Sequence, residues 1–443
     1  MAIHVSKRIL RFFLIVSFLL FCLIYTFSGE HVTSHVKNNK VAGYISSNMP
    51  SFMVGKQQDV LDSKDKEGEQ MRLEAEHSQE VGETPVDPSE PQFLDEDAKA
   101  LMEAANGQSS NASLSAPSDG KVKACFVSLV RNSDMWSIIN SVRAVEDRFN
   151  RNYNYTWVFL NNEPFSEDFK RVVSNVIGGK AEFGLIPSEH WSYPEWIDQD
   201  KAAETRTEMA NNNIIYGDSE SYRHMCRYES GFFWRHPLLD EFDWYWRVEP
   251  DIKLYCDIDY DVFKWMQDNN KVYGFTISIH EYESTIKTLW KTTKEFMEQH
   301  PEHIHENNMM DFISDDGGKS YNLCHFWSNF EVASLKFWRS TAYREYFDYL
   351  DKAGGFFYER WGDAPVHSIA AALFLPRDQI HYFPEIGYHH PPYDNCPIDK
   401  DIWAEKKCSC NPDNDFTFKG YSCGKKYYDV NKLEKPKEWK KHT

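Results

Sequence analysis

Beyond residue 122, continuous apolar runs typical of buried strands alternate with apolar residues at helical spacing. The run Ala124–Val130 is apolar almost throughout, which predicts a buried strand. Ser133 is a candidate cap for the helix that follows. Apolar residues recur there at helical spacing, at Ile138, Val142, Val145 and Phe149. Two more strands and the helix between them are predicted at Tyr155–Leu160, Ala181–Ile186 and Glu167–Val176. Strands that alternate with helices predict parallel βαβ units and an α/β sheet, in which ligands lie beyond the carboxyl ends of the strands.

An uncharged apolar segment lies close to the N-terminus. It spans about sixteen residues, from Phe12 to Phe27, whereas a membrane helix usually needs ~20. A cleaved signal peptide is the alternative, but the small-residue cleavage pattern is missing. Basic residues precede the segment, and positive charge stays on the cytoplasmic side. We therefore predict a cytoplasmic tail (residues 1–11), a transmembrane anchor (12–28) and a lumenal remainder.

Residues 29–120 are poor in aromatic side chains and rich in Glu, Asp, Ser, Gln and Lys. This composition buries too little apolar surface to offset the entropy of ordering, so a disordered stem is predicted. Residues 30–119 carry about −10 of the net charge of −19. The acidity therefore belongs largely to the stem, and the lack of a basic patch argues against a nucleic-acid partner. One catalytic domain is expected at residues 121–443.

Nine cysteines are present, and Cys22 lies in the predicted anchor. Four others crowd into about the last fifty residues, at Cys396, Cys408, Cys410 and Cys423. An oxidising lumenal compartment favours disulfides, and a zinc site is the alternative, although no Cys-x-x-Cys spacing occurs. Four cysteines can pair in three ways, and the sequence does not choose among them.

The segment Phe242–Val248 alternates apolar with polar residues, which predicts a strand with one buried face. Pro250 ends the strand because it has no amide hydrogen to donate. Glu249 is thereby placed at the strand end on the ligand side of the sheet, with Asp251 two residues later. Hard divalent cations such as Mn²⁺ bind carboxylate oxygens together with phosphate oxygens and water. The end of this strand is therefore a candidate metal site.

A second acidic cluster, Asp257, Asp259 and Asp261, is similar to an Asp-x-Asp metal motif. It lies past the strand, and the apolar residues after it indicate that it opens a helix. Acidic residues in a first helical turn complement the helix dipole. Capping is therefore the preferred interpretation of this cluster, and metal binding is the alternative.

Two more carboxylates are candidates, each with a structural alternative. Glu331 lies in an apolar, extended-looking segment, where burial is costly unless the group is hydrogen-bonded or functional. A structural salt bridge is the other interpretation of Glu331. Asp363 fits the N-cap of a predicted helix with Pro365 in its first turn. Capping alone explains Asp363, so a substrate contact would be an additional role.

Histidines and one arginine complete the candidates. His389 and His390 follow a predicted strand and precede two prolines. They could offer a nitrogen to the same cation as Glu249. Arg131 stands at the end of the first strand, where it suits a diphosphate, and a surface arginine is the alternative.

Seven unusual strings occur in one order between residues 222 and 392. They are Tyr222-Arg-His-Met-Cys-Arg-Tyr, Ser230-Gly-Phe-Phe, Arg247-Val-Glu-Pro-Asp, Tyr255-Cys-Asp, Ser328-Asn-Phe-Glu, Arg360-Trp-Gly-Asp-Ala-Pro-Val-His-Ser and Gly387-Tyr-His-His-Pro-Pro. In these strings the chain resembles the fungal Golgi α-1,2-mannosyltransferases, family fifteen of the glycosyltransferases. The resemblance covers residues 121–443 and the layout of tail, anchor and stem.

The resemblance implies a GT-A-like fold, one α/β domain with a Rossmann-like nucleotide-binding half and an acceptor half. It implies a retaining enzyme that moves mannose from GDP-mannose to the 2-hydroxyl of an acceptor mannose with Mn²⁺. Glu249 and His390 match the metal ligands of the family, and Glu331 matches the glutamate proposed as nucleophile. The remaining matches are nucleotide, donor-sugar or acceptor contacts, at Arg131, Tyr222 and Asp363.

Several properties stay open or rest on the resemblance alone. Retention of the configuration at the anomeric carbon has two possible mechanisms. Either a carboxylate attacks from the face opposite GDP, or the acceptor hydroxyl attacks from the same face as the departing GDP, and the sequence does not choose between them. The expected partners are glycoproteins with O-linked or N-linked mannose chains, the Golgi membrane that a type II anchor would span, and other Golgi mannosyltransferases. A catalytically silent, carbohydrate-binding or scaffolding relative is the alternative to an enzyme. The joint presence of Glu249, Glu331 and His390 favours the enzyme.

Overall fold

The computed structural model describes residues 120–443. The predicted tail, anchor and nearly all of the stem lie outside the described residues and remain predictions. Among residues 120–443, no helix is both long and apolar enough to cross a membrane. The described part contains the whole of the predicted catalytic domain.

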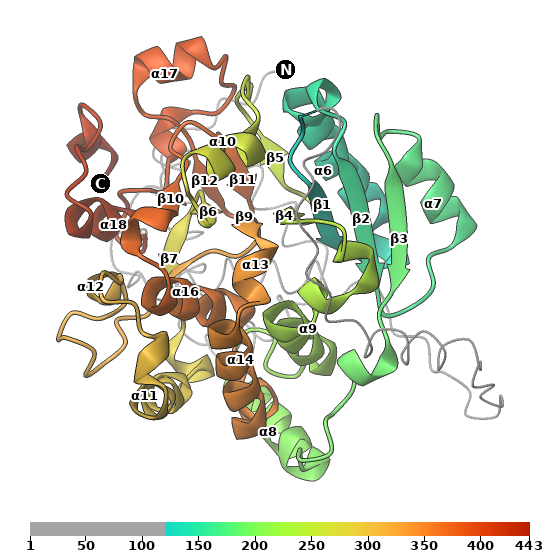
Figure 1. Cartoon of the computed structure of the whole chain (residues 1–443), viewed down its shortest axis with the longest axis vertical. Helices are drawn as coiled ribbons and strands as arrows, with labels where there is room; N and C mark the ends of the chain where they lie inside the picture. The colour runs from blue at the N-terminus through green and yellow to red at the C-terminus, as the bar shows by residue number, and fades with distance from the viewer. Residues whose placement is uncertain (1–119) are drawn as a thin grey trace, which may run out of the picture. The chain divides into compact units, whose positions relative to one another are not determined.

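A seven-stranded sheet forms the centre of this domain, in the order β10-β6-β9-β4-β1-β2-β3 (Figure 1). Its strands are β1 Ala124–Leu129, β2 Thr156–Asn161, β3 Ala181–Leu185, β4 Trp244–Val248, β6 Tyr273–Phe275, β9 Phe330–Ser334 and β10 Ile380–Tyr382. The neighbours β4, β1, β2 and β3 are parallel, as the alternation of strands and helices predicts. β9 runs antiparallel to both β4 and β6, so the complete sheet is mixed.

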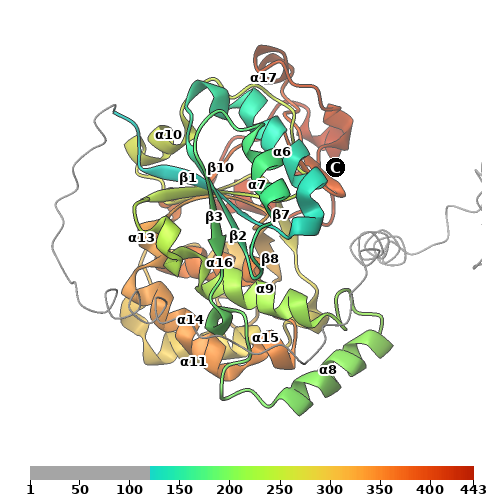
Figure 2. The ribbon, with the colours of Figure 1, turned by 90° about the vertical axis from the view of Figure 1, so that its right-hand side faces the viewer.

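Helices cover both faces of the sheet (Figure 2). Side chains of α6 Met135–Arg148, α7 Glu167–Ser174 and α10 Val262–Asp268 form one buried apolar cluster with one face. Side chains of α9 Glu220–Gly231, α11 Leu289–Gln299, α14 Thr341–Ala353 and α16 Asp363–Phe374 form another with the opposite face. The other α-helices are α8 Gln199–Asn211, α12 Met310–Ile313, α13 Leu335–Trp338, α15 Gly355–Tyr358, α17 Lys400–Glu405 and α18 Gly424–Val430.

β4 is buried on both faces, although its alternating pattern predicts burial of only one. Trp244 and Trp246 belong to the cluster that contains α6, and Tyr245 belongs to the cluster that contains α9. The side chain of Arg247 is only 9% exposed. The prediction of one solvated face is wrong because β4 lies between β1 and β9 with helices on both sides, so its polar residues meet partners instead of water.

The acidic segment after β4 has a structural role in this fold. Asp261 caps α10 by accepting a hydrogen bond from a backbone N–H of the first turn, at 3.1 Å. Asp257 pairs with Arg148 at 2.5 Å, and Asp259 pairs with Lys406 at 2.7 Å. Capping is confirmed for Asp261, whereas the other two carboxylates are held in ion pairs.

Two predicted helix caps are each wrong by one residue. The N-cap of α6 is Asp134, because Ser133 lies within a preceding 3-10 turn, Asn132–Asp134. The N-cap of α16 is Gly362, and Asp363 is the first residue of the helix. The Asp363 side chain is therefore free for contacts other than capping.

Three disulfides connect the C-terminal segment to itself and to the rest of the domain. They are Cys256–Cys408, Cys324–Cys423 and Cys396–Cys410. The expectation of disulfides is confirmed, but only Cys396–Cys410 joins two of the four C-terminal cysteines. The other two reach partners 152 and 99 positions earlier, which no pairing within the last fifty residues could provide.

Candidate active site

A small sheet brings the two predicted metal ligands together. β5 Lys253–Leu254 follows β4 closely and pairs with β11 Tyr388–His390, which also pairs with β12 Tyr393–Asn395. Glu249 comes directly after β4, and His390 is the last residue of β11. Glu249 Oε2 lies 3.3 Å from His390 Nε2, and the two side chains are 26% and 23% exposed. The structure thus places a carboxylate and an imidazole side by side at an accessible strand end.

The His390 ring is oriented to bind through Nε2. Its Nδ1 lies 3.0 Å from the carbonyl oxygen of Pro391, which places a hydrogen on Nδ1. Nε2 donates to Glu249 when the ring carries both hydrogens, and it offers a lone pair to a cation when the ring is neutral. Trp327 packs edge-on against this ring. Burial tends to raise the pKa of Glu249, but Arg247 and His390 outweigh it and lower that pKa to about 2. An ionised carboxylate beside an imidazole nitrogen is a donor set that suits Mn²⁺.

Arg247 connects three carboxylates next to this pair. Its Nη2 donates to Glu249 Oε1 at 2.5 Å, and its Nη1 donates to Asp363 Oδ2 at 2.6 Å. Glu229 Oε2 lies 3.8 Å from the same Nη1. Burial disfavours the Arg247 charge, but the surrounding carboxylates outweigh burial and raise the pKa of Arg247. Burial raises the pKa of Glu229 to about 7, although Arg247 acts in the opposite direction. Arg247 therefore stays charged and fixes Glu249 relative to Asp363.

Asp363 contacts this network instead of capping its own helix. In addition to Arg247, it accepts a hydrogen bond from Ser328 Oγ at 2.7 Å. Its side chain is 7% exposed. Burial tends to raise the pKa of Asp363, but Arg247 and His367 outweigh it and lower that pKa. Asp363 is therefore an ionised partner of Arg247, and the substrate contact that the sequence left open stays a prediction.

Glu331 on β9 is fully buried and hydrogen-bonded by three donors. The hydroxyl of Tyr245 donates to Oε2 at 2.7 Å, and the hydroxyl of Tyr273 donates to Oε1 at 2.8 Å. His367 Nδ1 lies 2.8 Å from Oε1, and its Nε2 lies 3.1 Å from the backbone oxygen of Glu229. Both ring nitrogens face acceptors, which suits the doubly protonated ring. Burial tends to lower the pKa of His367, but Glu331 outweighs it and raises that pKa.

Sequence reasoning singled out Glu331 and Glu249 but missed Arg247 and His367. Arg247 lies 116 positions from its partner Asp363, and His367 lies 36 positions from Glu331. One signal was present, because residues two apart in a strand share a face. Arg247 stands two positions before Glu249 and opposite Glu331 in the pairing of β4 with β9.

Arg131 reaches the first turn of α9, which contains Tyr222. Arg131 follows β1, and its Nη2 donates to Ser221 Oγ at 2.9 Å. Tyr222 stacks on Tyr216 with ring centroids 4.4 Å apart, and the guanidinium of Arg360 lies 5.2 Å from the Tyr222 ring. Arg131 is exposed, so an anion can reach it. The structure thus brings these two predicted nucleotide contacts to one helix terminus.

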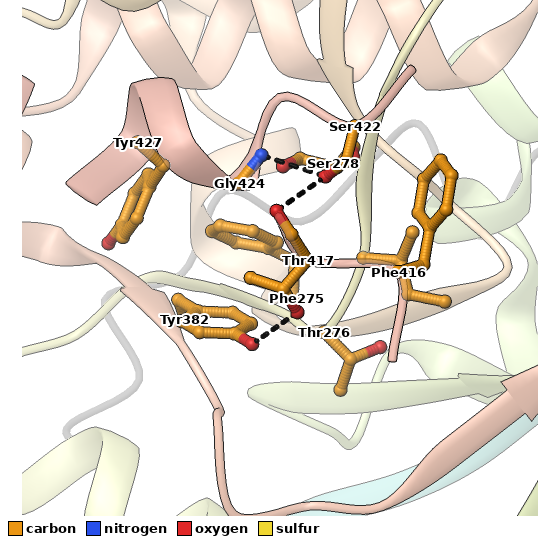
Figure 3. A pocket seen from close by; sticks show the side chains of 10 residues that line it. Phe275, Thr276, Ser278, Tyr382, Phe416, Thr417, Ser422, Gly424 and Tyr427 are labelled. Carbon is orange, nitrogen blue, oxygen red and sulfur yellow. Dashed lines mark hydrogen bonds between the residues drawn. The ribbon is translucent and has the colours of Figure 1, made fainter. Parts of the chain in front are cut away.

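A small pocket lies near the C-terminal segment, and Figure 3 shows its walls. It is lined by residues 275–278, Tyr382, Phe416, Thr417, Ser422, Gly424 and Tyr427. The six predicted site residues are absent from this lining. Hydrogen bonds from Ser422 Oγ to the backbone oxygens of Ser278 and Thr417 close one wall. The candidate active site is therefore the accessible strand end at Glu249 and His390, and this pocket is a separate feature.

An α/β sheet with a carboxylate and an imidazole beyond one strand end is an arrangement that can bind a divalent metal ion and a nucleotide. The family model described as glycolipid 2-alpha-mannosyltransferase matches residues 62–432. The chain belongs to this family of fungal α-1,2-mannosyltransferases, as its sequence strings predict.

Named relatives match over most or all of their length. The chain is 54% identical over 453 residues to glycolipid 2-alpha-mannosyltransferase of Saccharomyces cerevisiae, covering 100% of this chain and 99% of that protein. It is 66% identical over 322 residues to glycolipid 2-alpha-mannosyltransferase 2 of Candida albicans, covering 73% of this chain and 70% of that protein.

Two solved structures share the fold. Core-mannan synthase A from Aspergillus fumigatus, in its Mn/GDP form, has a TM-score of 0.67 at 40% identity and covers 73% of this chain and 88% of its own. The mannosyltransferase Ktr4p from S. cerevisiae, in complex with GDP, has a TM-score of 0.64 at 36% identity and covers 80% of this chain and 88% of its own. These structures confirm the predicted α/β glycosyltransferase fold.

Proposed function

We propose that this chain transfers mannose from GDP-mannose to the 2-hydroxyl of an acceptor mannose, with retention at the anomeric carbon. The family supports the reaction, and the solved relatives with GDP and Mn support the donor and the metal. The observation that carries the proposal is the approach of Glu249 Oε2 to His390 Nε2, at 3.3 Å, beyond β4. This pair offers one oxygen and one nitrogen, and both side chains are partly exposed to solvent.

Glu249 and His390 would hold Mn²⁺, and diphosphate oxygens and water would complete its coordination. The ion, when bound, neutralises charge that develops on the departing GDP. Arg247 keeps Glu249 ionised and oriented, and the Pro391 carbonyl sets the His390 ring. For Arg131, Tyr222 and Asp363 we propose the contacts that the family resemblance implies. Arg131 would bind diphosphate oxygens, Tyr222 the donor, and Asp363 a sugar hydroxyl.

The role of Glu331 as nucleophile stays a prediction. The hydrogen bonds of its side chain support an indirect role in the reaction instead. Both of its oxygens already accept hydrogen bonds, and its side chain has no exposed surface. A bond from Glu331 to the sugar would require the loss of at least one of these hydrogen bonds and a path to the substrate. We propose instead that Glu331 is a positioning residue that orders His367 and Tyr245 behind Arg247. Retention would then proceed by attack from the face of departure.

Acceptor and location rest on the sequence. We propose glycoprotein acceptors with O-linked or N-linked mannose chains, and a type II protein of the Golgi membrane. The apolar segment and the charges that flank it support a tail at 1–11, an anchor at 12–28 and a stem at 29–120. Association with other Golgi mannosyltransferases is proposed from the family resemblance alone.

One assay tests the proposed reaction. The full-length protein in detergent is incubated with labelled GDP-mannose and a panel of mannosides, with Mn²⁺ or with a chelator. We expect α-1,2-linked product with Mn²⁺ and none with the chelator. A folded protein that binds mannosides but transfers no label would instead be the catalytically silent relative.

A further inference from the structure

A second group of metal-ligating side chains lies away from Glu249 and His390, between two helices of the layer beside the sheet. His300 is the C-cap of α11, His303 ends the 3-10 helix that follows, and Glu345 projects from α14. One ligand atom from each residue lies within 4.8 Å of the other two. One other group of this kind occurs among residues 120–443, but two of its members, Cys324 and Cys423, form a disulfide and cannot bind an ion as thiolates.

The protein core holds the two imidazoles in place before any ion arrives. Both rings lie roughly parallel to the fully buried ring of Phe296, with centroids 4.7 Å away for His300 and 6.1 Å for His303. The two imidazole planes differ by only 5°. Glu345 Oε2 lies 2.6 Å from His303 Nε2 and 3.7 Å from His300 Nδ1. One carboxylate oxygen therefore faces one nitrogen of each ring.

We propose that His300, His303 and Glu345 form a Zn²⁺ site distinct from the active-site metal. Zn²⁺ binds nitrogen and carboxylate oxygen at about 2.0–2.2 Å in a tetrahedron, which places neighbouring ligand atoms about 3.3 Å apart. The two distances from Glu345 Oε2, 2.6 and 3.7 Å, lie on either side of that value, and all three ligand atoms lie within 4.8 Å of one another, so the side chains must rotate to share one ion. Glu302, whose Oε1 lies 3.3 Å from His300 Nδ1, is the candidate fourth ligand. Two imidazoles favour Zn²⁺, whereas one imidazole with carboxylate and phosphate oxygens suits Mn²⁺.

The ion would join α11 to α14 without touching the substrate. α14 in turn packs against α16, where Tyr346 and Phe374 meet edge to face with ring centroids 5.5 Å apart. α16 begins with Asp363, the partner of Arg247. An ion that binds only the folded protein stabilises it by mass action. The site would therefore stabilise the helices behind the active site and leave the reaction itself unchanged.

Zinc binding by the full-length protein in detergent tests this proposal. Saturating Mn²⁺ and GDP are present, so that Glu249 and His390 are already occupied. We expect calorimetry to show one equivalent of bound Zn²⁺, and we expect Zn²⁺ to raise the Tm. Co²⁺ in its place should give the intense visible bands of a four-coordinate ion.

Four variants locate the ion. His300→Gln and His303→Gln should each weaken Zn²⁺ binding by more than about tenfold and remove the Tm rise, with mannosyl transfer unchanged. His305→Gln is the matched control, because the His305 ring already accepts a hydrogen bond from the Asn307 amide at 3.0 Å. Absence of bound zinc, or zinc binding that survives both substitutions, would overturn the proposal. Zinc binding that is lost instead in Glu249→Gln would assign the ion to the active site and would overturn it as well.

Discussion

Two carboxylate–imidazole pairs in this domain have the same chemical composition and opposite surroundings. Glu249 and His390 are 3.3 Å apart and about a quarter exposed, whereas Glu331 and His367 are 2.8 Å apart with no exposed surface. His390 uses one ring nitrogen on a backbone carbonyl and turns the other toward Glu249. His367 uses both ring nitrogens on protein acceptors. One pair is partly exposed to solvent, and the other is completely buried.

The difference shows that residue types alone do not make a ligand site, because unused lone pairs and access are also required. The two pairs are nevertheless parts of one network. Arg247 binds Glu249 and stands opposite Glu331 in the sheet. Glu229 approaches Arg247 with its carboxylate and accepts from His367 with its backbone oxygen. The buried pair can therefore support the exposed pair without contacting the substrate.

The sharpest test of the exposed pair is Glu249→Gln. We expect kcat/KM to fall by at least about a thousandfold, because charge stabilisation of the leaving group is lost with the metal. Mn²⁺-dependent GDP binding, measured by equilibrium dialysis, should disappear with it. Asp259→Asn is the matched control, since Asp259 only pairs with Lys406. Tight Mn²⁺-dependent GDP binding by Glu249→Gln would show that another acidic group holds the metal.

The buried pair is tested by Glu331→Gln, with a smaller expected effect. If Glu331 positions His367, we expect kcat to fall by about a hundredfold while the KM for GDP-mannose changes little. The variant should also lose stability, because the charged ring of His367 is left buried without its counterion. A folded variant with near-normal turnover would rule out any part for Glu331 in the reaction.

A double-mutant cycle separates positioning from covalent chemistry. His367→Gln in addition to Glu331→Gln removes both charges, so it should recover part of the lost stability and of kcat. If Glu331 is the nucleophile, the double variant should show no recovery of kcat. A mannosyl adduct trapped on Glu331 would contradict the positioning role.

The sequence predicted those parts of this arrangement that depend on neighbours along the chain. β1, β2 and β3 follow from their apolar runs, and Pro250 places Glu249 at a strand end. The capping role of Asp261 was likewise visible in the helix that follows it.

Contacts between distant segments could not be predicted in the same way. The antiparallel entry of β9 beside β4 buries Tyr245 and Arg247, which a pattern of alternation assigns to water. The distant partners of Arg247 and His367 come from other elements, and only the position of Arg247, two residues before Glu249, carried a local signal. The same reason explains why Asp363 was assigned to a cap and why two disulfides reach back to distant cysteines.

His390→Ala should weaken the exposed pair without abolishing it. One ligand of several is lost, so we expect Mn²⁺ affinity to fall by about 10–100-fold and activity to recover at high Mn²⁺. Titration of activity with Mn²⁺ measures both effects. His389→Ala is the matched control, since His389 Nδ1 is engaged by Asp394 at 2.7 Å. An unchanged Mn²⁺ requirement in His390→Ala would contradict its role as a ligand.

The smallest effect is expected at Glu229, which joins the two pairs. Burial raises its pKa from 4.5 to about 7, so the folded state holds this proton more tightly than the unfolded state does. Its contribution to stability is then complete below pH 4.5 and is lost as the pH rises through 7. Glu229→Gln should remove about 1–3 kcal/mol of this decline in the unfolding free energy, measured with denaturant in the presence of a chelator.

Asp415 provides the control for this last prediction, because burial raises its pKa to about 7 as well. Asp415→Asn should flatten the same pH window, but it should leave Mn²⁺-dependent activity unchanged, since Asp415 accepts its hydrogen bonds from Cys396 and Thr417. Glu229→Gln should flatten the window and also alter activity, because it changes the charge beside Arg247. A Glu229→Gln variant with the wild-type pH slope would mean that Arg247 keeps Glu229 ionised in the folded state. The Arg247 guanidinium would then balance the charges of Glu229, Glu249 and Asp363. The Glu249–His390 and Glu331–His367 pairs would in that case be coupled more tightly than the raised pKa of Glu229 implies.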